Sequence, residues 1–176
     1  MRIHRENSSL NLSLNLVEAR FLRHVLSEVI RNYRLRPEEL APKAAHAWYS
    51  TRGCSTAKMS AEETREWLKN LHSFKEANLA RLEDWARQLG EGHTAHYHLQ
   101  IKLDDAPHLM TALNDHRLLA AAQHDIGRDE MDANSLSAFA KLRADQRSVL
   151  YEIHLLAHVI EEILRALPDS PSNWER

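Results

Sequence analysis

The hydrophobic and polar positions alternate strictly over residues 10–15, where leucine occupies every second position. A period of two places the leucines on one face of a β-strand and the polar side chains on the other. The turn-forming residues Asn7-Ser8-Ser9 precede this strand, so residues 2–6 are predicted to form its hairpin partner. A second alternation, over residues 97–103, predicts another strand.

From residue 16 the apolar period becomes that of an α-helix. This helix is predicted to end before Pro37, because the residue preceding a proline disfavours helical backbone. A second helix is predicted over about residues 60–89. Ser60 and Glu63 have the spacing of a capping box at its start, and Gly90 is a suitable left-handed stop at its end.

A third helix is predicted to open at residues 104–107, and a last helical region spans residues 134–167 with a break near 144–147. The predicted fold class is mainly α, of the α+β kind: a bundle of about four main helices with a small antiparallel β element. The predicted core-facing positions are Ala19, Leu22, Val25, Leu26, Val29 and Tyr33 in the first helix, Trp67, Leu71, Phe74, Leu82, Trp85 and Leu89 in the second, and Leu150, Ile153, Ala157, Ile160, Leu164 and Leu167 in the last.

The two strand-to-helix segments resemble each other at an offset of 87 residues, with five identities in the 17 positions from Leu12 to Glu28. This similarity favours an internal duplication into halves 1–89 and 90–176, in which the strands pair across a pseudo-twofold axis. The alternative is that any amphipathic strand leading into a helix has such a pattern. In either case residues 1–176 are predicted to form a single domain.

The charge and composition of the chain exclude several classes of function. Among 176 residues, 23 Lys and Arg balance 25 Asp and Glu, so no nucleic-acid-binding surface is expected. The longest apolar run, residues 118–122, is too short to cross a membrane, and residues 1–9 lack the apolar core of a signal peptide. The single Cys54 excludes an internal disulfide and fits a reducing compartment. A cytoplasmic location is therefore expected.

The high number of histidines, 12 in the chain, is the one unusual feature of the composition. His96 and His98 share the polar face of the second predicted strand, and His154 and His158 are four residues apart on the last helix. Either pair is a possible metal-ligand pair if a further ligand joins it. Solvent-exposed faces and pairing between neighbouring surface side chains explain these positions more simply, so no metal or other cofactor is predicted.

The most informative segment is the third predicted helix, where Asn114, Asp115, His116 and Arg117 lie among apolar residues. A helix that is apolar on several sides is enclosed by neighbours, and a buried polar group there needs a partner. Asp115 and Arg117 are two residues apart and do not face each other, so each is expected to reach another element. A buried network bracing the two halves is favoured over a recognition site at their junction. A bracing Arg117 would make Arg117→Ala cost about 3–5 kcal/mol.

The segment Leu113-Asn114-Asp115-His116-Arg117-Leu118, followed by Asp125-Ile126-Gly127, resembles the Leu-Asn-Asp-x-Arg-Leu signature of an uncharacterised bacterial family, the domain of unknown function numbered two-zero-one-seven. The resemblance extends to residues 18–23 and to Leu150-Tyr151. The alanine-rich run after Leu119 and the histidines 154 and 158 depart from the family pattern. The family has no established activity. Its genes lie beside that of the Clp protease adaptor in some bacteria, which implies a link to regulated proteolysis.

No nucleophile with an activating base, phosphate-binding loop or full ligand set is evident, so an enzyme is not favoured. The leading hypothesis is a non-enzymatic interaction or regulatory protein that binds a protein partner, such as a Clp adaptor or protease component, or itself. Trp48, Tyr49 and Trp174 are candidate exposed anchors for it, although contact with the helical core is the favoured interpretation of each. The alternative is a small-molecule or metal-binding protein that uses residues 114–117 with nearby histidines. No membrane partner is expected.

Overall fold

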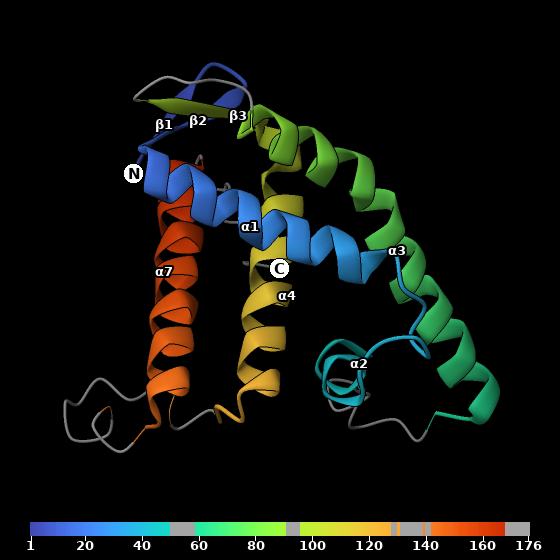
Figure 1. Ribbon diagram of the computed structural model, residues 1–176. Helices are drawn as coiled ribbons and strands as arrows, with labels where there is room; N and C mark the ends of the chain where they lie inside the picture. The colour runs from blue at the N-terminus through green and yellow to red at the C-terminus, as the bar shows by residue number, and fades with distance from the viewer. Residues whose placement is uncertain (50–58, 91–95, 128–129, 131–138, 140–141, 168–176) are drawn as a thin grey trace, which may run out of the picture.

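The computed structural model describes residues 1–49, 59–90, 96–127, 130, 139 and 142–167. Its elements, in chain order, are β1 (Arg2–Glu6), β2 (Ser9–Leu14), α1 (Leu16–Tyr33), α2 (Pro42–Tyr49), α3 (Ala61–Gln88), β3 (Tyr97–Lys102), a 3-10 turn η2 (Leu103–Asp105), α4 (Ala106–Gln123) and α7 (Ala144–Ala166). The predicted mainly α, α+β class is confirmed. Figure 1 shows the sheet at one end, α4 and α7 side by side beneath it, α1 crossing them and α3 running diagonally along the other side.

The three strands form an antiparallel sheet in the order β1-β2-β3. Asn7, in the turn between β1 and β2, takes a left-handed conformation with φ 53°, which asparagine tolerates better than most residues. Across β2 and β3, Leu12 lies opposite Leu99, and these two residues are the ones that the offset of 87 equates. A pseudo-twofold axis requires this register, although the duplication itself stays a prediction.

One face of the sheet is apolar and faces the helices. Leu10, Leu12 and Leu14 of β2 are buried, and so are Leu99 and Ile101 of β3. The strict alternation in the sequence therefore predicts the inward face correctly. A small ribbon of this kind is marginally stable alone, so its stability depends on the helices that cover the leucines.

The start of α1 is fixed by a capping box. The Asn15 side chain accepts a hydrogen bond from the Glu18 amide at 2.9 Å, and the Glu18 carboxylate accepts one from the Asn15 amide at 2.8 Å. The predicted core-facing residues of this helix are all buried. The helix ends at Tyr33, slightly before the proline that was expected to limit it.

The long helix α3 has the predicted cap, since the Ser60 amide donates to the Glu63 carboxylate at 2.7 Å and the Glu63 amide donates to the Ser60 hydroxyl at 3.2 Å. Its predicted apolar stripe is partly wrong. Phe74 is 46% exposed, whereas the adjacent Lys75 is 3% exposed. The Phe74 ring lies beside the ring of His108, with centroids 5.9 Å apart. A rotation of 100° between neighbouring helical residues separates these two environments.

Helix α4 buries nine of its 18 residues, which span about two thirds of its circumference, as the prediction of an enclosed helix requires. Helix α7 begins at Ala144, where a break was predicted. Its predicted stripe is wrong in part, because Leu164 is 53% exposed. Packing against α4 and β1 turns the helix so that the buried positions are Gln146, Leu150, Ile153, Leu156, Val159 and Ile163.

The short helix α2 was not predicted. Trp48 and Tyr49 are only 6% and 8% exposed, so the favoured interpretation, contact with the helical core, is confirmed for both, and they are not surface anchors. Cys54, Trp174 and most of residues 134–143 of the last predicted helical region lie outside the described residues. Within the described ranges, no helix combines the length and apolar character needed to cross a bilayer.

Candidate functional site

The four candidate residues of α4 point to different environments. Asp115 and His116 are buried, with 9% and 6% exposure, whereas Asn114 is exposed and Arg117 is intermediate. Successive residues of a helix are rotated by 100°, so four consecutive side chains cover most of the circumference. The structure therefore does not bring residues 114–117 to one site.

Asp115 is the centre of a buried cluster in which α1, α2, α3 and α4 meet. Its Oδ2 atom accepts a hydrogen bond from the Tyr33 hydroxyl at 2.6 Å and forms an ion pair with Lys75 Nζ. The indole Nε1–H of Trp48 donates to the backbone carbonyl of Asp115 at 2.8 Å. One residue of α4 thus joins the three helices of the first half of the chain. We call Tyr33, Trp48, Lys75 and Asp115 the buried cluster.

The Lys75 ammonium lies among aromatic rings as well as beside the carboxylate. Its Nζ is 4.8 Å from the centroid of the Tyr33 ring and 4.7 Å from that of Trp48. The two rings meet edge to face, with centroids 5.5 Å apart and an interplanar angle of 77°. Aromatic faces attract a cation electrostatically, and more strongly where water is excluded. The rings therefore compensate part of the desolvation of Lys75.

Burial alters the acid–base properties of the cluster. Burial lowers the pKa of Lys75, an effect that the Asp115 carboxylate opposes. Burial and the Asp115 carboxylate raise the pKa of Tyr33 far above its usual value, so its hydroxyl stays protonated and donates. The same two causes, in the same order, raise the pKa of the neighbouring Tyr49 to about 12.

The arrangement is suited to bracing rather than to chemistry on a ligand. The side chains of Lys75 and Asp115 are 4% and 12% exposed, and their charges face each other. A buried pair of this kind costs several kcal/mol when one partner is removed, because the other charge is left uncompensated. The cluster thus fixes the relative positions of four helices.

His116 belongs to a separate contact between α4 and α7. Its Nε2 atom lies 2.6 Å from Oε1 of Glu152. The hydrogen bond from His116 lowers the pKa of Glu152, against the opposing effect of burial. This contact joins the two long helices of the second half.

Asn114 is exposed and Arg117 is half-buried, and the two side chains contact each other. The Arg117 Nη1 atom is 3.4 Å from Oδ1 of Asn114, and its Nε is buried without a partner in the described part of the chain. Arg117 makes no hydrogen bond to another element within the described residues, but its guanidinium interacts electrostatically with Glu161 of α7, so its expected bracing role stays a prediction. Three residues separate Arg117 from Asn114 on one helix face, and that spacing permits the local contact.

Lys75 was missed by the sequence analysis, although a signal for it exists. Positions 75, 78, 82 and 85 of α3 and the following Leu89 are spaced alternately by three and four residues and are all buried. Lys75 and Asn78 are polar members of this otherwise apolar series. A lysine in register with a core stripe predicts a buried partner of opposite charge.

The histidines are not gathered in the described part. His98 is exposed on β3, with Nδ1 3.4 Å from the Ser13 hydroxyl, and His154 and His158 are exposed on α7. His72 Nε2 lies 3.4 Å from Oε1 of Glu76, four residues further along α3. Over the described ranges, no group of three His, Cys, Asp or Glu side chains has the geometry to hold a metal ion.

The fold and the cluster define a mainly helical α+β protein with a buried polar brace. Comparison of the chain with protein-family models, with curated proteins and with solved structures gave no match. The resemblance to the bacterial family of unknown function therefore stays a prediction.

Proposed function

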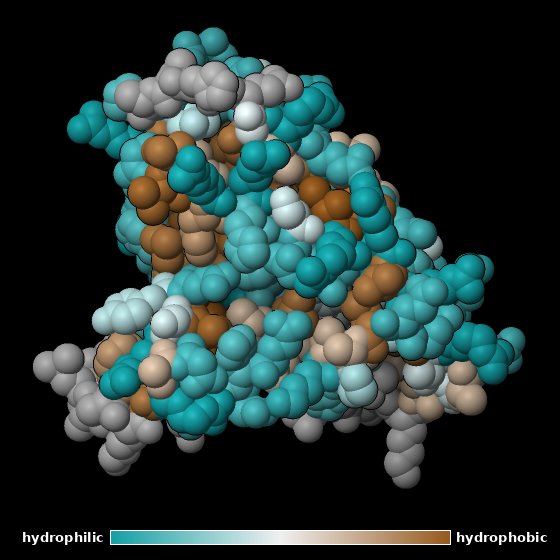
Figure 2. Space-filling view, in the orientation of Figure 1, coloured by the Kyte–Doolittle hydropathy of each residue, from teal (hydrophilic) through white to brown (hydrophobic). Residues whose placement is uncertain are grey.

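We propose that the protein is a non-enzymatic module that binds a partner protein through an apolar surface formed by α1 and α7. The observation that carries the proposal is a group of exposed apolar side chains around a small hollow between these helices. Val17 of α1 is 75% exposed, and Leu155 of α7 is 42% exposed. Figure 2 shows hydrophobic side chains gathered over the upper part of α7, beside the start of α1.

The hollow has the size of a side chain rather than of a cofactor. Its volume is about 40 Å³, well below the several hundred Å³ typical of a ligand pocket. It is lined by Met1, Leu14, Glu18, Phe21, Leu22, Leu155 and Val159. A hollow between two helices accepts one apolar side chain from a third, as in helix-in-groove recognition. We call this hollow and the adjoining Val17 the α1–α7 surface.

The surface continues along both helices. Val17 and Phe21 are four residues apart and share a face of α1. Tyr151 and Leu155 have the same spacing on α7, and Tyr151 is 67% exposed. An amphipathic helix of a partner would contact such positions with residues spaced by one turn. The buried cluster holds α1 against α4, and the contact of His116 with Glu152 holds α7 against α4, so the two helices of the surface have fixed positions, which lowers the entropic cost of binding.

The resemblance to the bacterial family suggests the class of partner, an adaptor or protease component of Clp-type proteolysis. A photoreactive amino acid at position 155 of the full chain, in its native cells, would capture the partner for identification by mass spectrometry. The affinity of the purified partner is then measured with two variants, Leu155→Glu and Leu164→Glu.

The two leucines form a matched pair because both are exposed on α7 and nine residues apart, about 180° around the helix. We expect Leu155→Glu to weaken binding at least tenfold, about 1.4 kcal/mol, and Leu164→Glu to leave it unchanged. Equal effects of the two variants, or the absence of a stoichiometric complex, would contradict the proposal. If light scattering shows a dimer that only Leu155→Glu dissociates, the occupant is a second copy and the proposed heterologous partner is wrong.

A further inference from the structure

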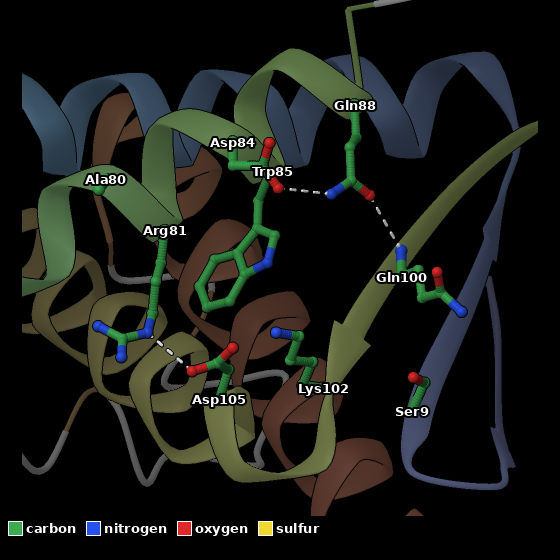
Figure 3. A pocket seen from close by; sticks show the side chains of 9 residues that line it. All are labelled: Ser9, Ala80, Arg81, Asp84, Trp85, Gln88, Gln100, Lys102 and Asp105. Carbon is green, nitrogen blue, oxygen red and sulfur yellow. Dashed lines mark hydrogen bonds and ion pairs between the residues drawn. The ribbon is translucent and has the colours of Figure 1, made fainter.

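A polar cavity, separate from the α1–α7 surface, lies between α3 and the junction of β3 with η2. Its volume is about 440 Å³, within the range of small-molecule sites. Figure 3 shows its lining, which comes from β2, α3, β3 and η2: Ser9, Ala80, Arg81, Asp84, Trp85, Gln88, Gln100, Lys102 and Asp105. We call it the α3–β3 pocket.

The two carboxylates of the pocket are already paired. Asp105 accepts a hydrogen bond from Nε of Arg81 at 2.7 Å. Asp84 accepts one from Nη1 of Arg87 at 3.0 Å and one from Nε2 of Gln88 at 2.9 Å. Each acid thus has an arginine partner that neutralises it. A cation in this pocket would find no carboxylate without a counter-charge.

The Gln88 side chain joins α3 to β3 at one end of the pocket. Its Oε1 accepts the backbone amide of Gln100 at 3.2 Å, while its amide nitrogen donates to Asp84. Figure 3 shows this chain of hydrogen bonds crossing from α3 to the edge of β3. The lining is therefore preorganised, a property that reduces the cost of ordering a site around a ligand.

Two donors in the pocket remain unused. Within the described part of the chain, neither the Lys102 ammonium nor the Trp85 indole N–H makes a hydrogen bond or ion pair. Trp85 is only 4% exposed, but its Nε1 atom is not among the fully buried polar atoms that lack a partner, so the indole N–H keeps access to the cavity. Figure 3 shows the indole nitrogen on the side of the ring that faces Lys102. An unbalanced positive charge and an unused donor thus face the same space.

We propose that the α3–β3 pocket binds a small organic oxyanion, a carboxylate or a phosphate ester. The anionic group would accept hydrogen bonds from Lys102 Nζ and Trp85 Nε1, because oxyanions are the acceptors that best match a cation and a neutral donor together. The volume exceeds that of the anionic group alone, so the rest of the ligand would lie against the Trp85 ring and Ala80. This site is separate from the α1–α7 surface and does not depend on it.

Indole N–H signals in a two-dimensional ¹H–¹⁵N NMR spectrum test the proposal directly, since the chain has four tryptophans. The Trp85 signal is assigned from its loss in Trp85→Phe. Benzoate and phenyl phosphate are titrated as organic oxyanions, benzylamine as a cation of similar size, and inorganic phosphate as a free anion. We expect the two aromatic oxyanions to shift the Trp85 signal with millimolar affinity, and benzylamine to leave it unchanged.

The matched variants are Lys102→Gln in the pocket and Lys69→Gln on the exposed surface of α3. Lys102 is itself exposed, so its replacement leaves the core intact. We expect Lys102→Gln to weaken benzoate binding about tenfold and Lys69→Gln to have no effect. No shift of the Trp85 signal up to about 10 mM, or equal affinities of the two variants, would overturn the proposal. Inorganic phosphate binding as tightly as phenyl phosphate would show that the site does not recognise an organic ligand.

Discussion

The Tyr33 hydroxyl donates to Asp115 Oδ2 at 2.6 Å, across 82 residues of sequence, and the same oxygen atom pairs with Lys75. One carboxylate oxygen therefore ties α1 and α3 to α4. Because the Asp115 backbone also accepts from Trp48, α2 is held by the same residue. The brace depends on Asp115 more than on any other member of the cluster.

Asp115→Asn is expected to lower the free energy of unfolding by about 3–5 kcal/mol, because Lys75 loses its counter-charge while remaining buried. The double variant Lys75→Met/Asp115→Asn is expected to recover part of this loss, since the asparagine oxygen still accepts from Tyr33 and no unpaired charge remains. Urea denaturation of the wild type and the three variants, with Lys75→Met as the fourth corner of the cycle, measures the coupling. A loss below 1 kcal/mol in Asp115→Asn would show that the pair does not brace the helices.

Arg117→Met is expected to change the free energy of unfolding by less than about 1 kcal/mol. Its observed hydrogen bond, to Asn114 on the same helix, is long at 3.4 Å. Burial lowers the pKa of its guanidinium, with Glu161 opposing, so the charged form gains little from its position. Methionine keeps the apolar stem and removes the unpartnered Nε. The variant is compared with Asp115→Asn by the same denaturation measurement, and similar losses for the two would restore a bracing role for Arg117.

The strands and the helix starts follow from local sequence. The leucine alternation of β2 and the capping pair of Ser60 and Glu63 act within a few residues, so their patterns can be recognised without the rest of the chain. The buried cluster cannot be found in this way. Its central contacts join Asp115 to residues 40 and 82 positions away, and only tertiary packing decides which of them it meets.

The environments of the polar residues of α4 likewise could not be predicted from local sequence patterns. The sequence marks residues 114–117 as unusual because they are polar residues within an apolar helix. Two of them, Asp115 and His116, are buried. The sequence does not determine the rotation of the helix, and that rotation separates buried Asp115 from exposed Asn114. The α1–α7 surface was also missed, because Val17 and Leu155 are apolar residues whose exposure depends on the packing of two helices.

Stability is expected to fall as pH rises from about 10 to 12, in part through Tyr49. Burial and the Asp115 carboxylate raise the pKa of Tyr49 to about 12, above the value near 10 of an unfolded tyrosine. The contribution is therefore complete below the unfolded pKa and is lost as pH rises towards the folded pKa. Urea denaturation of wild type and Tyr49→Phe at pH 9, 10 and 11 isolates this residue, since other titrating groups are common to both proteins. A stability difference that is independent of pH would contradict the raised pKa.

The contact between His116 and Glu152 predicts that the stability of the protein falls as pH decreases in the acid range. The hydrogen bond from His116 lowers the pKa of Glu152 below that of an unfolded glutamate, about 4.3. Its stabilisation is thus present above pH 4.3 and is lost as pH falls through the depressed folded pKa. Glu152→Gln is expected to cost about 1–2 kcal/mol at pH 7, and the difference from wild type should shrink at pH 3. Glu161→Gln, on the exposed side of the same helix, is the control that should change stability little.

Asn78 is expected to be replaceable by leucine with a gain of stability. It is 1% exposed, and neither its amide nitrogen nor its amide oxygen has a partner in the described part of the chain. A buried polar group without a hydrogen bond costs about 1–3 kcal/mol, and leucine has the same branched shape without the polar atoms.

Thermal and urea denaturation of Asn78→Leu are expected to show a gain of about 1–2 kcal/mol, somewhat less than the full penalty because the methyl groups of leucine are larger than the amide atoms. Asn78→Ala is the matched control, since it removes the polar atoms but leaves a cavity, so it should be less stable than Asn78→Leu. If Asn78→Leu is destabilised while Asn78→Ala is not, steric space rather than the unsatisfied amide determines the energy at this position.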